Sequence, residues 1–142
     1  MSTIGVTGAI SRSDNKRMTE HAVLYYKEIR KRTTDVAAIT ANTRFTIADV
    51  DIVKQHLFFN KYDLGGNEPE RFSPSYDIAV SWQRLIEGNH IQEMDIALLN
   101  HELLEYSYMQ AGKDFFEAHR LAEKEYNYAG YVKELDLAEG VR

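Results

Sequence analysis

Apolar residues recur at spacings of three and four along most of the chain, which is the pattern of helices with one buried face. The first such stripe predicts a helix over residues 15–32; it consists of Met18, Ala22, Tyr25, Tyr26 and Ile29. Its last turn is basic, which suits the negative end of the helix dipole. A short helix over 35–41 follows, and a capping-box spacing at Thr46 opens a third helix.

Residues 60–74, with the sequence NKYDLGGNEPERFSP, interrupt this pattern. They hold both prolines and the only Gly-Gly pair of the chain, so no helix is expected there. Helical spacing then returns. Three helices are predicted: from Ser75 to Gly88, over 93–111 up to Gly112, and from Asp114 onward with a bend at Gly130 and fraying near Gly140.

No stretch alternates apolar and polar residues in the way of a half-buried strand. The chain is therefore predicted to be all-α, a single compact domain of about six helices that ends in an antiparallel helix hairpin around Gly112. The domain covers residues 14–142, with the loop 60–74 inside it. Residues 1–13 are polar and rich in Ser and Gly, which predicts a flexible leader.

Composition narrows the chemistry. The chain has 142 residues, of which 44% are apolar, enough for one core. It has no cysteine, which excludes disulfides, thiolate metal sites and cysteine nucleophiles. The net charge of −5 argues against a large nucleic-acid surface. No run approaches the roughly 20 apolar residues of a membrane span, and the first residues do not resemble a signal peptide. These features predict a cytoplasmic protein.

The segment 94–109, MDIALLNHELLEYSYM, carries the most unusual pattern. On a helical wheel it is apolar nearly all round, which is typical of a buried helix. The same helix contains His101, Glu102 and Glu105. Burying carboxylates without partners costs several kcal/mol, so such groups are normally paired, protonated or bound to a metal. This conflict indicates a candidate site.

The next helix offers partners for these side chains. If Gly112 marks the turn of the hairpin, Glu105 lies seven residues before it and His119 seven residues after it. His101 and Glu123 are both eleven residues from the turn. With a rise of about 1.5 Å per residue, the members of each pair lie at the same height. The spacing predicts a cluster between the two helices.

Three interpretations of this cluster remain open. In the first, His101, Glu105 and His119 bind one divalent metal ion (Zn, Mn or Fe), and Glu102 acts on the bound water as a catalytic base. The motif H-E-L-L-E then resembles the H-E-x-x-H motif of zinc hydrolases, with a carboxylate in place of the second histidine. In the second, a His–Glu pair performs acid–base chemistry without metal. In the third, the same groups are a structural network in a non-enzymatic interaction module.

Two further residues are candidate binding positions. Asp77 lies in the first turn of its helix, where a carboxylate complements the dipole, and Arg84 is a candidate clamp for a phosphate or carboxylate. Three further histidines have no partner in the pattern and are interpreted as surface or locally satisfied residues: His21, His56 and His90.

Residues 35–53 resemble a helix-turn-helix, and residues 46–56 would then be the recognition helix. Asp49 and Asp51 would repel phosphate there, with only Lys54 in support. A structural role is favoured, and nucleic acid is not the expected partner.

Several strings together resemble one family. They are TTDVAAITANTRFT, RFSPSYDIAVSWQRL, LLNHELLEY and EAHRLAEKEYNY. The chain resembles domains attached to phage minor head (head-morphogenesis) proteins of Gram-positive bacteria, whose C-termini resemble the variable tips of polymorphic toxins. The resemblance covers most of residues 10–130. It implies a phage or prophage context, a toxin-like effector role, a cytoplasmic or virion-associated location, and a protein partner such as a phage head or an immunity protein.

Overall fold

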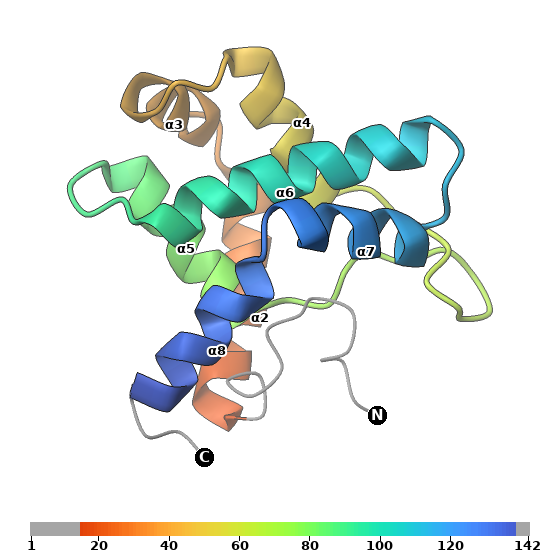
Figure 1. Ribbon diagram of the computed structural model, residues 1–142. Helices are drawn as coiled ribbons and strands as arrows, with labels where there is room; N and C mark the ends of the chain where they lie inside the picture. Colours follow the sequence, from red (N-terminus) through yellow and green to blue (C-terminus); the bar gives the residue numbers. More distant parts are fainter. Residues whose placement is uncertain (1–14, 139–142) are drawn as a thin grey trace.

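The computed structural model describes residues 15–138, and this part of the chain forms one all-α domain (Figure 1). Its seven helices are α2 (Lys16–Lys31), α3 (Asp35–Asn42), α4 (Ile47–Phe58), α5 (Tyr76–Glu87), α6 (Glu93–Gln110), α7 (Phe115–Glu125) and α8 (Tyr128–Ala138). The predicted fold class is confirmed. The predicted leader and the predicted fraying near Gly140 lie outside the described residues.

Short polar side chains begin the helices as the sequence predicts. Thr46, Ser75 and Asp114 each accept a hydrogen bond from a backbone N–H of the first turn, which otherwise has no partner within the helix. Gly88 and Gly112 end α5 and α6 with φ of +80° and +108°, a conformation that disfavours residues with a Cβ. Local sequence chemistry therefore sets most of the helix bounds.

The prediction of one long last helix with a bend at Gly130 is wrong. The chain instead forms two helices, and the break between them lies before Gly130. The chain leaves α7 at Tyr126, which is extended, and α8 begins at Tyr128. The Asn127 side chain accepts a hydrogen bond from the Gly130 N–H at 2.9 Å and so caps the new helix. A Cβ at Gly130 would lie 2.6 Å from the Asn127 amide, so this glycine permits the cap. The break raises the helix count from about six to seven.

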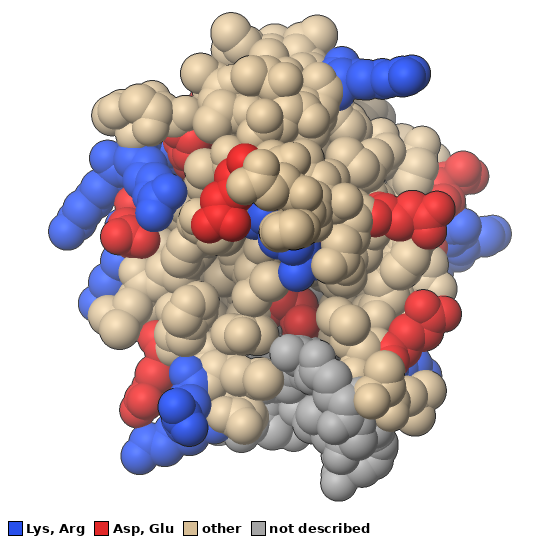
Figure 2. Space-filling model, turned by 90° about the vertical axis from the view of Figure 1, so that its left-hand side faces the viewer, with Lys and Arg blue, Asp and Glu red and all other residues tan. Residues whose placement is uncertain are grey.

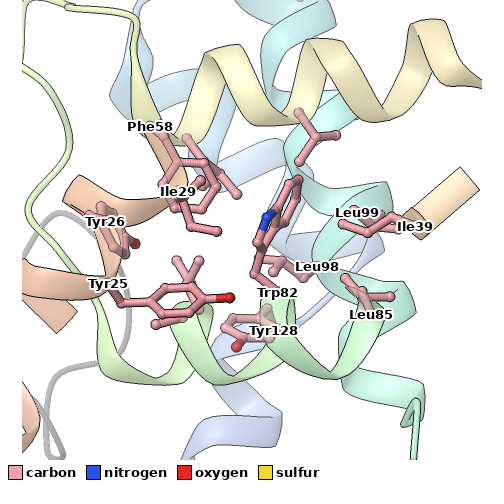
Figure 3. Close-up of a cluster of buried hydrophobic side chains, with 14 of the residues drawn as sticks. Tyr25, Tyr26, Ile29, Ile39, Phe58, Trp82, Leu85, Leu98, Leu99 and Tyr128 are labelled. Carbon is pink, nitrogen blue, oxygen red and sulfur yellow. The ribbon is translucent and has the colours of Figure 1, made fainter. Parts of the chain in front are cut away.

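The core lies among α2, α3, α4, α5, α6 and α8 (Figure 3). Trp82 is fully buried, and its ring contacts Phe58 with centroids 5.2 Å apart, while Phe58 in turn contacts Tyr26 at 4.7 Å. Leu98 and Leu99 of α6, Ile39 of α3 and Tyr128 of α8 extend this cluster. Because α6 also packs against α7 and α8, it is covered on most sides, which explains its apolar residues all round.

The segment resembling a helix-turn-helix has a structural role in the fold. Lys54, the one lysine expected to support phosphate binding, is buried, and its Nζ lies 2.8 Å from Asp35 Oδ1 and 2.9 Å from the Arg32 carbonyl oxygen. Asp35 also accepts a hydrogen bond from the Trp82 indole. The face in Figure 2 mixes acidic and basic side chains without a continuous patch of either sign. These observations oppose the interpretation as a recognition helix.

Candidate metal centre

Helices α6 and α7 run antiparallel beside each other and bring the predicted pairs together (Figure 1). His119 Nδ1 lies 2.8 Å from Glu105 Oε2, and His101 Nδ1 lies 3.2 Å from Glu123 Oε1. Both pairings follow from counting residues outward from Gly112. The hairpin prediction is therefore confirmed in fold and in register.

Three potential ligand atoms converge on the inner side of the hairpin. His101 Nε2 lies 3.2 Å from Glu105 Oε2 and 3.3 Å from His119 Nδ1, and His119 Nδ1 is 2.8 Å from the same carboxylate oxygen. Ligands about 2.0–2.1 Å from one tetrahedral ion are separated by about 3.3 Å from each other. The triangle thus has nearly the dimensions of three ligands around one metal ion.

His56 of α4 joins this cluster, which the sequence interpretation missed. Its side chain is fully buried rather than on the surface, and its Nε2 lies 2.7 Å from Glu105 Oε1. The available signal was its position three residues after Val53, on the buried face of the predicted helix. Its partner on α6 is 49 residues away, so no local pattern could identify it.

Outer contacts fix the orientation of the two inner histidines. His101 Nδ1 faces Glu123 and the backbone oxygen of Tyr126, at 3.2 and 3.1 Å, which directs its Nε2 inward. On the other side, His56 Nδ1 lies 2.7 Å from the hydroxyl of Tyr62, contributed by the long loop. Metal-binding histidines usually have such a partner on their second nitrogen.

Glu102 is buried and borders a small cavity. Its Oε1 lies 3.4 Å from His56 Nε2, and its Oε2 lies 3.9 Å from His101 Nε2. The cavity is otherwise lined mostly by apolar and aromatic side chains: Tyr26, Leu57, Phe72, Ile78 and Phe115. About 10 Å³ is open to the centre of a water molecule, which is about the space that one water needs.

The pKa values of the two buried glutamates of α6, Glu102 and Glu105, are shifted in opposite directions. Burial and the neighbouring charge of Glu105 raise the pKa of Glu102 to about 7. Burial would also raise the pKa of Glu105, but hydrogen bonds from His101, His119 and His56 hold it well below the usual range. Two adjacent carboxyl groups whose pKa values are driven apart are typical of an acid–base site.

The same contacts raise the pKa values of the two histidines of the hairpin, His101 and His119. Burial would lower the pKa of His101, but hydrogen bonds to Glu105 and Glu123 raise it to about 11. The pKa of His119 is raised by its hydrogen bond to Glu105, which outweighs burial. In the described part of the chain, neither these glutamates nor Glu102 forms an ion pair with a lysine or arginine. Histidine is the counter-ion of the cluster.

The remaining binding candidates lie in other surroundings. Arg84 forms two hydrogen bonds to Asp95, at 2.8 and 2.7 Å, so its guanidinium already holds a carboxylate of the chain itself. Asp77 is buried in the first turn of α5. Neither residue contributes to the contacts among His101, Glu105 and His119.

The raised pKa of His101 predicts how stability depends on pH in the presence of a chelator. A histidine whose pKa is higher in the folded state stabilises fully below its unfolded value of 6.5 and loses this effect as the pH rises toward about 11. His119 acts in the same direction. The free energy of unfolding, measured by urea titration, is therefore expected to fall between pH 7 and 9.5.

The substitution His101→Asn is expected to flatten this slope, whereas His90→Asn, at an exposed position, leaves it unchanged. Glu102, whose pKa is raised to about 7, contributes a slope of the same sign up to about pH 8, so the two proteins are compared above that pH. A slope that is equal in the wild type and in His101→Asn would contradict the assigned contacts.

Comparison with protein-family models, with curated proteins and with solved structures gave no match. None of the helices in residues 15–138 combines the length and the apolar character needed to cross a membrane. The cluster is therefore interpreted from its own geometry.

Proposed function

We propose that this protein is a metal-dependent hydrolase in which His101, Glu105 and His119 bind a divalent ion and Glu102 is the catalytic base. The observation that carries the proposal is the convergence of these three side chains, with ligand atoms 2.8–3.3 Å apart, in a partly buried site. Two histidines and one carboxylate leave a coordination position open, as catalytic zinc sites do. The same ligand types also suit Mn²⁺ and Fe²⁺.

A divalent ion would replace the protonated histidines as the counter-charge of the buried carboxylates. Glu102 and Glu105 are both nearly inaccessible, and a buried carboxylate needs a compensating charge. Histidines supply that charge only while protonated. A divalent ion would compensate both carboxylates directly and leave the imidazoles neutral, in the form that binds metals.

Glu102 has the properties of a base in this reaction. A bound divalent ion lowers the pKa of a coordinated water and polarises the bond to be cleaved. Glu102 borders the cavity beside the proposed ligands, a position from which a carboxylate can accept a proton from a bound water and return it. The apolar walls of the cavity restrict access of bulk water.

The exposed side of the hairpin is the expected route for substrate. The side chain of His119 is 30% exposed and that of Glu123 is 24% exposed, whereas His56 and Glu105 are enclosed.

The resemblance to phage minor head and polymorphic-toxin domains supports a toxin-like effector role, with a phage head or an immunity protein as partner.

Metal analysis of the purified protein is the first test. We expect at least one equivalent of Zn, Mn or Fe per chain by elemental mass spectrometry, and loss of this metal in both His101→Ala and His119→Ala. The exposed His90→Ala is the matched control and should retain the metal. Folding of each variant is checked by circular dichroism. A folded wild type that takes up none of the three metals after dialysis against each of them would contradict the proposal.

Expression in a bacterial host tests the hydrolytic role. We expect growth arrest with the wild type and relief of this arrest with Glu102→Gln, since a catalytic base contributes about 10²–10⁴-fold to rate. Glu125→Gln, at an exposed position of α7, is the control. Equal arrest by the wild type and by folded Glu102→Gln would exclude Glu102 as the base of a toxic reaction.

A further inference from the structure

We infer that the centre holds two divalent ions, with Glu105 as the ligand they share. This inference rests on the proposed function, because it adds an ion to the same site. The first ion lies between His101, His119 and Glu105, as proposed above. The second lies between His56, Glu102 and Glu105, a set that the sequence did not reveal.

The two oxygens of Glu105 face different sets of side chains. Oε2 lies 3.2 Å from His101 Nε2 and 2.8 Å from His119 Nδ1, whereas Oε1 lies 2.7 Å from His56 Nε2. A carboxylate that presents each oxygen to a separate group of ligands is arranged to bridge two ions. Two-metal hydrolytic sites have ions about 3.5–4 Å apart, a distance that such a carboxylate spans.

The second set has the geometry and burial of a metal site by itself. His56, Glu102 and Glu105 offer ligand atoms that all lie within 4.8 Å of one another. The shortest of these distances are 2.7 Å and 3.4 Å, both from His56 Nε2. The exposed fractions of the three residues are 0%, 6% and 1%. A site enclosed in this way holds its ligands in place before the ion arrives.

The hydrogen bonds around the two sets are parallel. His101 presents Nε2 to the first set while its Nδ1 faces Glu123, and His56 presents Nε2 to the second while its Nδ1 faces the Tyr62 hydroxyl. Tyr62 also accepts a hydrogen bond from the Asn60 amide at 3.0 Å. A hydroxyl can accept two hydrogen bonds, so it can also accept the Nδ1–H of a metal-bound His56.

The charge of the cluster is compatible with two ions. The cluster contains three carboxylates and three histidines, with no lysine or arginine paired to these carboxylates in residues 15–138. One divalent ion with neutral imidazoles leaves an excess negative charge in a largely buried site. Two divalent ions with a hydroxide between them make the cluster neutral, which removes the cost of an unpaired buried charge.

This arrangement also defines the role of Glu102. Its Oε1, on the side of His56, would bind the second ion, while Oε2, on the side of His101, would remain free to accept the proton of the bridging hydroxide when that hydroxide attacks the substrate. The same residue is then both ligand and base. Loss of Glu102 would remove the second ion together with activity.

Titration of the metal-free protein with Mn²⁺ or Zn²⁺ tests the inference. We expect two equivalents per chain by calorimetry and by elemental analysis after gel filtration, and a spin-coupled Mn²⁺ pair by electron paramagnetic resonance. The substitution His56→Ala should lower the stoichiometry to one, and His90→Ala should leave it at two. One equivalent in the wild type would overturn the two-ion inference and leave the proposed function standing, whereas no binding would overturn both.

A milder variant keeps the test valid if His56→Ala fails to fold. Tyr62→Phe removes the hydroxyl that orients His56 but leaves every proposed ligand in place. Loss of such an outer partner typically weakens metal binding by about 10–100-fold. We expect this weakening for the second equivalent alone, and equal weakening of both equivalents, or of neither, would overturn the inference.

Discussion

Replacement of Glu105 by glutamine is expected to abolish metal binding and to lower the free energy of unfolding of the metal-free protein by about 3–5 kcal/mol. Glu105 is nearly inaccessible and lies within hydrogen-bond distance of three histidines: His56, His101 and His119. Glutamine has almost the same shape but no charge, and its amide nitrogen donates rather than accepts. The three imidazoles would therefore lose their common counter-ion.

Metal content and urea unfolding of the same preparation measure the two effects. Glu125→Gln is the matched control, because it makes the same chemical change at an exposed position of the neighbouring helix. It should alter neither metal content nor stability beyond about 0.5 kcal/mol. Retention of a full metal complement in Glu105→Gln would remove this residue from the ligand set and with it the bridge between two ions.

The hairpin part of the site could be predicted because its determinants are local. Gly112 fixes the turn, Asp114 starts the next helix, and equal counts from the turn place Glu105 opposite His119. Helix geometry then requires the two side chains to lie at the same height. No information from distant parts of the chain is needed for this pairing.

The inner part of the site depends on tertiary packing, which the sequence pattern does not encode. His56 reaches Glu105 only because α4 packs against α6, whereas Tyr62, which also contacts His56, lies only six residues after it. A histidine at a core position of a helix is compatible with either simple burial or ligation. Only the arrangement of α4 beside α6 decides which groups it meets.

The same limit applies to Arg84 and to the last helix. The sequence of α5 alone gives Arg84 no partner, which suggested that it could bind a ligand. Because α5 packs against α6, Arg84 instead forms hydrogen bonds to Asp95. The local pattern is compatible with two arrangements after α7: a new helix capped by Asn127, or one continuous helix that bends at Gly130. The structure has the first. Helix existence was therefore predicted better than helix boundaries and long-range partners.

Metal binding should also raise the thermal stability of the domain. An ion at about 100 times its dissociation constant stabilises the folded state by about 2.7 kcal/mol, provided that the unfolded chain does not bind it. In a domain of this size each kcal/mol raises Tm by about 4 °C, so we expect an increase of about 10 °C. The ligands come from α4, α6 and α7, which means that unfolding any of these helices disrupts the site.

Differential scanning calorimetry with saturating Zn²⁺ or Mn²⁺, and again after addition of a chelator, measures this shift. In His119→Ala the increase should become smaller, because the hairpin then lacks one of the ligands of the first ion. In His90→Ala it should persist in full. A structural polar network predicts the opposite pattern, in which the metal leaves Tm unchanged in every variant and His119→Ala lowers Tm equally with and without the ion. The metal dependence of Tm therefore separates a metal centre from a network that only joins α6 to α7.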